Sequence, residues 1–132
     1  MQDVSLVAVL VAALSGFALG AVWYGPLFGP RWMRLVGMTP QTLQQGFSPL
    51  KAYGLTFVLS LIAAGLMGWG IAPDPGIKEG LGFGLLIGAG WVAASLMTND
   101  LFERRPLALT LINGGYHVVR FTIMGLVFGL LG

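Results

Sequence analysis

Long apolar runs alternate with short polar segments along the chain, and four of the runs are long enough to cross a bilayer. A hydrocarbon core of about 30 Å needs about 20 helical residues. The runs therefore predict four transmembrane helices, at about Val4–Tyr24, Pro49–Ile71, Pro75–Thr98 and Pro106–Leu131. We expect residues 1–132 to form a single four-span transmembrane domain.

Residues that start and stop helices flank these runs. Asp3 is placed to cap the first helix, and a proline follows a capping Ser48 or Asp74 at the start of the second and third. Proline suits the first turn of a helix because that turn leaves its N–H groups unbonded anyway. Pro106 holds the same position in the fourth span, whereas the turn-rich segment Gly25–Pro30 is expected to end the first helix.

The connection between the first two spans mixes basic and bulky apolar residues. Arg31–Val36 has the composition of a short helix lying in the membrane interface. Thr39–Pro40 can cap a further short helix that runs through Gln45 and ends at Gly46. The predicted fold class is an all-α membrane protein with four transmembrane helices and a short interfacial helix between the first and second.

Small and polar residues predict where these helices touch, because membrane helices associate through close packing and interhelical hydrogen bonds. At regular helical spacing, one face of the third span collects Gly84, Gly88, Trp91, Ser95, Thr98, Asn99 and Phe102. The first span offers Gly16 and Gly20, and one face of the second offers Tyr53, Thr56, Ser60, Ala64 and Gly68. The fourth span has two such faces, so we expect it to be central in the bundle or at a subunit interface. Four short-looped helices leave little room to enclose a pathway, which predicts a homo-oligomer, most simply a dimer.

Composition and charge agree with this interpretation. The chain is 56% hydrophobic and only 9% charged, whereas a soluble domain carries about 25% charged residues. The lipid bilayer is the expected partner, and the scattered basic residues do not indicate nucleic acid. Five of them lie in the first and third loops, against Lys78 alone in the second: Arg31, Arg34, Lys51, Arg104 and Arg105. The positive-inside rule then predicts a multi-pass protein of the plasma or inner membrane with both termini on the non-cytoplasmic side. Trp23, Tyr24, Trp32, Tyr53 and Trp69 are interpreted as lipid anchors near the span ends.

Arg120 is the most unusual residue of the chain, because it falls near the centre of the fourth apolar span. It shares one helix face with Asn113, Tyr116 and His117. A charge at this depth costs about 2.5–3.5 kcal/mol on insertion scales, and no acidic residue lies at the same depth in any span. Two explanations remain open: a brace between helices, or a site for a solute, an anion or a lipid headgroup. The candidate ligand-binding residues are Arg120, His117, Tyr116, Asn113, Asn99 and Ser95.

The sequence gives little support for catalysis or a cofactor. Cysteine is absent, and a lone His117 does not define a zinc site, which wants about four ligands. His117 can relay protons in principle, since the pKa of imidazole lies near 6.5. The serines have no evident histidine and acid around them, so an enzyme is the least favoured class, and no metal or cofactor is expected.

Two stretches resemble a known family. Leu19–Met33 contains Trp-Tyr-Gly-Pro-Leu-Phe-Gly, and Asn99–His117 contains Phe-Glu-Arg-Arg-Pro and Ile-Asn-Gly-Gly-Tyr-His. In combination they resemble the small four-helix membrane proteins grouped as domain of unknown function 1761. The resemblance implies an integral membrane protein and carries no assigned activity or binding residues.

We therefore expect a homo-oligomeric channel or transporter-like protein that binds a small solute, anionic if Arg120 contacts it, at a polar site within the membrane. The alternative is a non-transporting scaffold or lipid-interacting protein whose polar residues brace the helices.

Overall fold

A computed structural model describes residues 5–71, 73 and 75–131. All regular structure in these residues is helical. Four helical segments are long and apolar enough to cross a membrane, namely Leu6–Leu27, Pro49–Gly70, Gly76–Glu103 and Leu107–Leu131. The prediction of an all-helical chain with four helices of membrane-spanning length is confirmed.

The described helices include two π-helical segments, η1 and η2, which lie within the first and third spans. In chain order the elements are α1 (Leu6–Val22), η1 (Trp23–Leu27), α2 (Gly29–Val36), α3 (Pro40–Gln44), α4 (Pro49–Gly70), α5 (Gly76–Leu85), η2 (Leu86–Ala93), α6 (Ala94–Glu103) and α7 (Leu107–Leu131).

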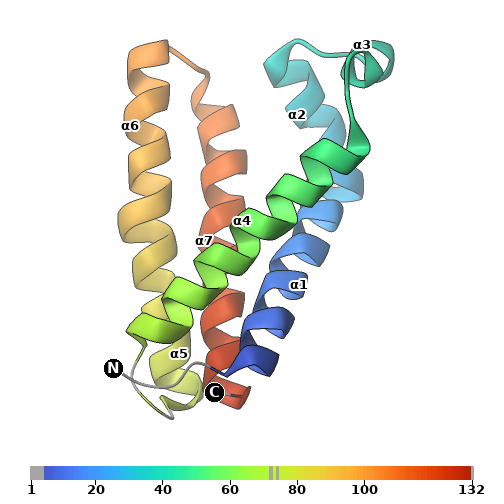
Figure 1. Ribbon diagram of the computed structural model, residues 1–132. Helices are drawn as coiled ribbons and strands as arrows, with labels where there is room; N and C mark the ends of the chain where they lie inside the picture. The colour runs from blue at the N-terminus through green and yellow to red at the C-terminus, as the bar shows by residue number, and fades with distance from the viewer. Residues whose placement is uncertain (1–4, 72, 74, 132) are drawn as a thin grey trace.

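The two ends of the bundle differ (Figure 1). One end carries α2, α3 and the α6–α7 turn, and we call it the loop end. The other carries the start of α1, the α4–α5 connection and the end of α7, and we call it the terminus end. α4 crosses the bundle obliquely, whereas α7 runs between α1 and the α5–α6 segment.

Local chemistry explains most helix boundaries. Ser5 caps α1, with its side chain accepting a hydrogen bond from the N–H of Ala8, while the expected caps Asp3 and Asp74 lie outside the described residues. Ser48 caps α4 as predicted. α5 and α7 begin just after their prolines, at Gly76 and Leu107.

The first span continues past its predicted end. Pro26 has no N–H to donate, so the chain widens into η1, and the N–H of Phe28 bonds the carbonyl of Trp23, five residues back, at 2.8 Å. Gly25 takes a non-helical conformation (φ −100°, ψ −105°) that bends the segment. The turn-rich sequence therefore kinks the helical path instead of stopping it at Tyr24.

The two short helices of the first loop form as expected. α2 covers the predicted segment and ends at Gly37, whose φ of +75° favours glycine. Thr39 and Thr42 cap α3 reciprocally, and Gly46 follows with a φ of +67°. Their location in a membrane interface stays a prediction.

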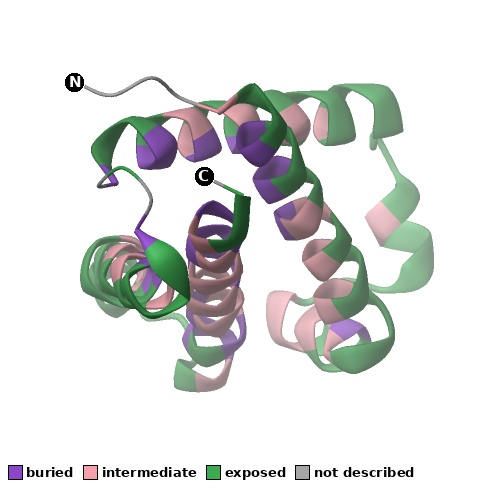
Figure 2. Cartoon of the chain, turned by 90° about the horizontal axis from the view of Figure 1, so that it is seen from below, coloured by how far each residue is buried: buried purple, intermediate pink, exposed green. Residues whose placement is uncertain are grey.

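The buried core lies mainly toward the terminus end. Small side chains of α1 and α4 let α7 approach, and large side chains of α7 fill the space between the helices. The core residues are Ala8, Val9, Ala12 and Ala13 of α1, Ala64 and Met67 of α4, Ile71 just after α4, and Phe121, Met124, Val127 and Phe128 of α7. Figure 2 shows buried residues on the sides of the helices that face one another around α7. The outward faces carry many exposed apolar side chains, including Leu6, Leu10, Leu14, Leu59, Leu66 and Leu86. Such a surface is typical of contact with lipid and not with water.

α5 and α7 meet backbone to backbone. A methyl group built on Gly84 would collide with the carbonyl of Phe121, and one on Gly80 would collide with that of Gly125. Gly129 fits against the carbonyl of Gly76 in the same way. This contact fixes one side of α7 against the third span and confirms the predicted seam for the glycines.

The remainder of the predicted seam does not pack against another helix of the same chain. Trp91 and Phe102 are 69% and 86% exposed, and Ser95, Thr98 and Asn99 are exposed too. The cause is η2, because a π-helix closes its bonds five residues apart and each residue turns the chain by less than in an α-helix. Beyond η2 a different set of residues therefore faces α7, including the buried Asp100.

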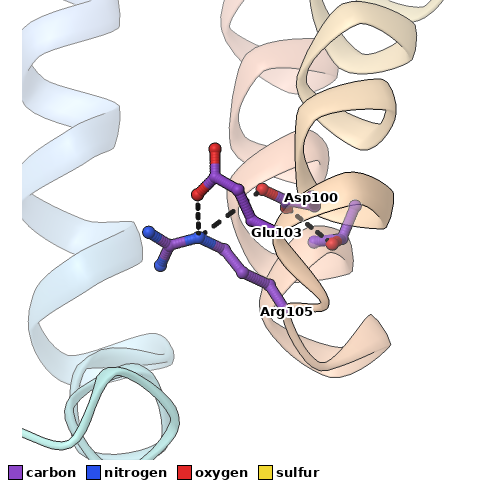
Figure 3. Close-up of polar contacts among 4 residues, drawn as sticks. Asp100, Glu103 and Arg105 are labelled. Carbon is purple, nitrogen blue, oxygen red and sulfur yellow. Dashed lines mark hydrogen bonds and ion pairs between the residues drawn. The ribbon is translucent and has the colours of Figure 1, made fainter.

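Asp100 anchors the turn between α6 and α7 (Figure 3). Its carboxylate accepts a hydrogen bond of 2.6 Å from the Thr110 hydroxyl on α7. Arg105 Nε lies 2.9 Å from Glu103 Oε1 and 3.9 Å from Asp100 Oδ1, so its guanidinium bridges the two carboxylates. Arg104 closes α6 in the left-handed conformation with a φ of +58°. These contacts fix where α7 starts relative to α6.

We predict that Gly84→Ala destabilises the protein by about 1–3 kcal/mol, the range for overpacking a tight contact, because its methyl group has no space beside Phe121. Gly82→Ala is the matched control on the same helix, since nothing lies within 4 Å of its added methyl group. That change should be neutral or stabilise the helix by about 0.5–1 kcal/mol. Thermal unfolding in detergent measures both, and equal midpoints would contradict the close α5–α7 contact.

We predict that Thr110→Val destabilises the protein by about 1–3 kcal/mol, because a buried carboxylate loses its donor while the side-chain shape is kept. Thr98→Val is the control, since its exposed hydroxyl bonds only the Ala94 carbonyl of its own helix. It should change stability by less than about 0.5 kcal/mol. The same unfolding measurement applies, and a similar loss for both variants would refute a specific role of the Asp100–Thr110 bond.

Candidate functional site

One uninterrupted helix, α7, carries the four polar residues that the sequence placed together. Gly114 and Gly115 do not break it. Arg120 lies near its middle, and Asn113, Tyr116 and His117 lie above Arg120 toward the loop end. The structure distributes these side chains among different neighbours, so we describe each in turn.

Arg120 is buried, with only 8% of its surface exposed. Its Nη2 donates to Ser60 Oγ of α4 at 3.3 Å, and its Nη1 lies 3.5 Å from His117 Nδ1. The guanidinium carbon lies 4.8 Å from the centre of the Phe121 ring. Since arginine only donates, the contact with His117 requires an unprotonated Nδ1 and leaves the ring proton on Nε2.

These contacts satisfy the guanidinium poorly. Hydrogen bonds from a charged donor are usually about 2.7–2.9 Å long, and both contacts of Arg120 exceed that. Nε is buried and has no hydrogen-bond partner. The ion pairs found in the described residues all involve Arg105 and not Arg120. A buried positive charge is thus held by neutral groups alone.

Gly16 of α1 makes the space for this side chain. A methyl group there would lie 3.2 Å from Arg120 Cγ and 3.3 Å from its Nε. The carbonyl of Gly16 accepts a hydrogen bond of 3.0 Å from the Tyr116 hydroxyl. Tyr116 and Arg120 therefore meet at the same residue of α1, one helical turn apart on α7.

An aromatic layer joins η1 to α7 above Arg120. Tyr24 donates to Asn113 Oδ1 at 2.7 Å, and Trp23 Nε1 donates to the carbonyl of Ile112 at 2.9 Å. The rings of Tyr24 and Tyr116 pack edge to face with centroids 5.3 Å apart. Trp23 and Tyr24 thus bind α7, which differs from the lipid-anchor role expected from the sequence.

Ser95 and Asn99 lie away from Arg120. Both are exposed on α6 and line an open groove of about 450 Å³ that also contains His117. The six predicted residues therefore do not form one cluster. His117 connects the groove to Arg120, and Asn113 and Tyr116 belong to the aromatic layer near α1.

A second cavity of about 570 Å³ lies between α1, η1, α4 and α7. Phe17, Tyr24, Tyr53 and Tyr116 contribute aromatic walls, and Gly20 and Thr56 also line it. Gly20 is close to the Tyr116 hydroxyl, which a methyl group at that position would approach to 3.2 Å. Gly16 and Arg120, which contact each other one turn closer to the terminus end, do not line the cavity.

Ser60 is the site residue that the sequence-based prediction missed. It was placed among the small residues of the second span, and its burial on α4 beside Arg120 gives it a polar role. A serine at mid-span depth was the available signal. No group of three or more metal-binding side chains occurs in the described part of the chain.

The chain has four helices of membrane-spanning length with apolar outer faces, and its polar side chains gather around a central helix. These are features of an all-helical integral membrane protein. The chain belongs to the family of proteins of unknown function DUF1761, which matches residues 7–129. This match confirms the resemblance noted from the sequence. No curated protein and no solved structure matches the chain.

We predict that Tyr24→Phe destabilises the protein by about 0.5–1.5 kcal/mol, because the ring stays but its hydrogen bond to Asn113 is lost. Tyr53→Phe is the control, since Tyr53 is 56% exposed on α4. It should leave the unfolding midpoint nearly unchanged. If the two variants unfold alike, the Tyr24–Asn113 bond does not hold η1 to α7.

Proposed function

We propose that the protein binds a small anion at Arg120 within the membrane and acts as a homo-oligomeric channel or transporter-like protein. The observation that carries this proposal is the buried Nε of Arg120, which has no hydrogen-bond partner in the described residues. An anion is the group that best complements an under-bonded guanidinium, because charge-assisted hydrogen bonds are short and strong. Ser60 and His117, which already contact Arg120, would complete its surroundings.

The proposal includes an orientation and an assembly. The basic residues of the α2 region and of the α6–α7 turn favour a cytoplasmic loop end, with both termini on the other side of the plasma or inner membrane. The exposed Ser95 and Asn99 beside His117 favour a second copy of the chain against this face, since lipid tails offer polar groups no partner.

One observation favours a second candidate, in which the polar residues only brace the bundle. Arg120 links α7 to Ser60 of α4, two helices that are far apart in sequence. If Arg120 serves only to link these helices, the protein is a scaffold or lipid-interacting protein. Removing Arg120 then destabilises the fold, and there is no ligand binding to lose.

We predict that Arg120→Leu abolishes anion binding or flux while the folded assembly persists. Losing charged hydrogen bonds of roughly 1.5–3 kcal/mol each corresponds to at least a tenfold loss in affinity. Chloride and acetate are the probes, measured by titration calorimetry in neutral phosphatidylcholine nanodiscs and by flux into vesicles of the same lipid. Size-exclusion chromatography and thermal unfolding report the fold.

Arg34→Leu is the control, since it removes the same charge from an exposed position on α2. It should leave binding within twofold of the unchanged protein. Loss of folding in Arg120→Leu would favour the second candidate, in which Arg120 braces the helices. The proposed function would be overturned if neither chloride nor acetate showed binding that depends on Arg120.

A further inference from the structure

We infer that the anion bound at Arg120 is an organic monoanion with an apolar body, which occupies the aromatic cavity between α1, η1, α4 and α7. The inference rests on the proposed function and names its substrate class. It comes from three features on adjoining turns of α1 and α7: a large, open, mainly apolar cavity, the Tyr116 side chain that lines it, and the buried Arg120 with an unused donor one turn further on.

The size of the cavity argues against an inorganic ion as its occupant. It measures about 570 Å³, whereas a water molecule takes about 30 Å³ of liquid volume. Pockets for small organic ligands measure roughly 300–1,000 Å³. A halide would leave most of this space unfilled, and a ring or a short acyl chain would fill much of it.

The walls of the cavity select an apolar body. Phe17, Tyr24, Tyr53 and Tyr116 line it, and the ring of Phe17 packs edge to face against Tyr53 at 6.1 Å between centroids. Aromatic walls contact a further ring in edge-to-face or offset geometry. Aromatic walls also pack against an acyl chain, so a ring and a chain both provide the apolar body that the cavity requires.

The polar contacts come from Tyr116, which lines the cavity, and from Arg120, which lies next to it on α7 toward the terminus end. Gly20 and Tyr116 line the cavity, and Gly16 and Arg120 follow one turn closer to the terminus end on the same two helices. The Tyr116 hydroxyl now donates to Gly16 O, and Arg120 Nε packs against Gly16 without a partner. An anionic group between them takes a hydrogen bond from each, after the Tyr116 hydroxyl turns away from Gly16.

The charge of the site sets the charge of the ligand. Arg120 is the only arginine or lysine on α1, α4 and α7 at this depth, and no described carboxylate pairs with it. One guanidinium compensates one negative charge, and a second uncompensated charge is costly in a medium of low polarity. A carboxylate has two acceptor oxygens, one for the unused Nε–H of Arg120 and one for the Tyr116 hydroxyl, so a monocarboxylate is the best match.

The test compares benzoate, hexanoate and acetate, each titrated by calorimetry into the full-length protein in phosphatidylcholine nanodiscs. Benzoate or hexanoate should bind roughly tenfold to a hundredfold more tightly than acetate, as expected for burying an apolar body of this size. Empty nanodiscs give the background from partition into lipid. A preference for benzoate indicates a ring and one for hexanoate a chain, and either supports the inference.

Ala21→Phe fills the cavity from α1, and the neighbouring Val22→Phe is its matched control, because both positions are exposed but only Ala21 lines the cavity. Thr56→Phe fills it from α4, with Leu55→Phe, at 55% exposure, as control. Each filling variant should weaken benzoate or hexanoate binding at least tenfold and leave acetate within threefold. Each control should bind all three like the unchanged protein. Two independent pairs keep the test valid if one filling variant does not fold.

The outcomes separate the two proposals. If acetate binds through Arg120 but the larger anions bind no better, or if filling the cavity changes nothing, the substrate class is wrong and the proposed function stands. If no anion binds in a way that Arg120→Leu removes, both fail.

Discussion

Close backbone contact with α5 restricts where α7 can carry large side chains, and the remaining architecture follows from that restriction. On this side α7 presents Gly125 and Gly129 to glycines of α5, so the two helices approach until carbonyls meet Cα atoms. Large polar residues must then leave α7 on other sides. Tyr116 and Arg120 contact α1 at Gly16, where the absence of a side chain leaves room for them. Each crowded residue on one helix is matched by the absence of a side chain on its neighbour.

This arrangement divides the molecule into a tightly packed half and a more open half. Toward the terminus end, alanines of α1 and α4 close around Met124 and Phe128 of α7. Toward the loop end, the proline-widened η1 and the π-helical η2 move the chain away from regular packing, and the cavities lie there. Arg120 lies at the boundary between the halves. The Arg120 guanidinium has apolar packing toward the terminus end and polar side chains toward the loop end. An anion would therefore reach it more easily from the loop end.

Periodicity and helix-capping residues were enough to predict the four long helices, the two short ones and the central place of α7. They also showed that Arg120 lacks an acid at its depth. The error in the third span has a physical origin, because the sequence projection assumed 100° per residue throughout. η2 changes that angle, so Ser95, Asn99 and Trp91 leave the predicted seam. Trp23 and Tyr24 have a different explanation, because regular spacing already places Trp23 on the face of Gly16 and Gly20. Their hydrogen bonds to α7 show that this face meets a helix and not lipid. No local propensity announces a π-helix in an apolar run, although Pro26 could have signalled the first. Ser60 was placed on the correct face, but only the three-dimensional structure pairs it with Arg120.

Arg120 either braces the helices or binds a ligand, and the two roles differ in whether they require a positive charge at position 120. A link between α7 and Ser60 needs only a neutral donor, which would avoid the insertion cost of about 2.5–3.5 kcal/mol that an arginine carries. The observed contacts do little to offset that cost, because they are long, they go to neutral partners, and Nε has none. Packing alone therefore gives no reason to prefer arginine here. The proposed negatively charged ligand gives a reason to prefer arginine, because it accepts a hydrogen bond from the donor that the protein leaves unbonded. Its charge-assisted hydrogen bonds replace those that the guanidinium makes to water outside the membrane. No span carries an acid at the depth of Arg120. On this proposal, a built-in carboxylate at that depth would occupy the place that the ligand needs.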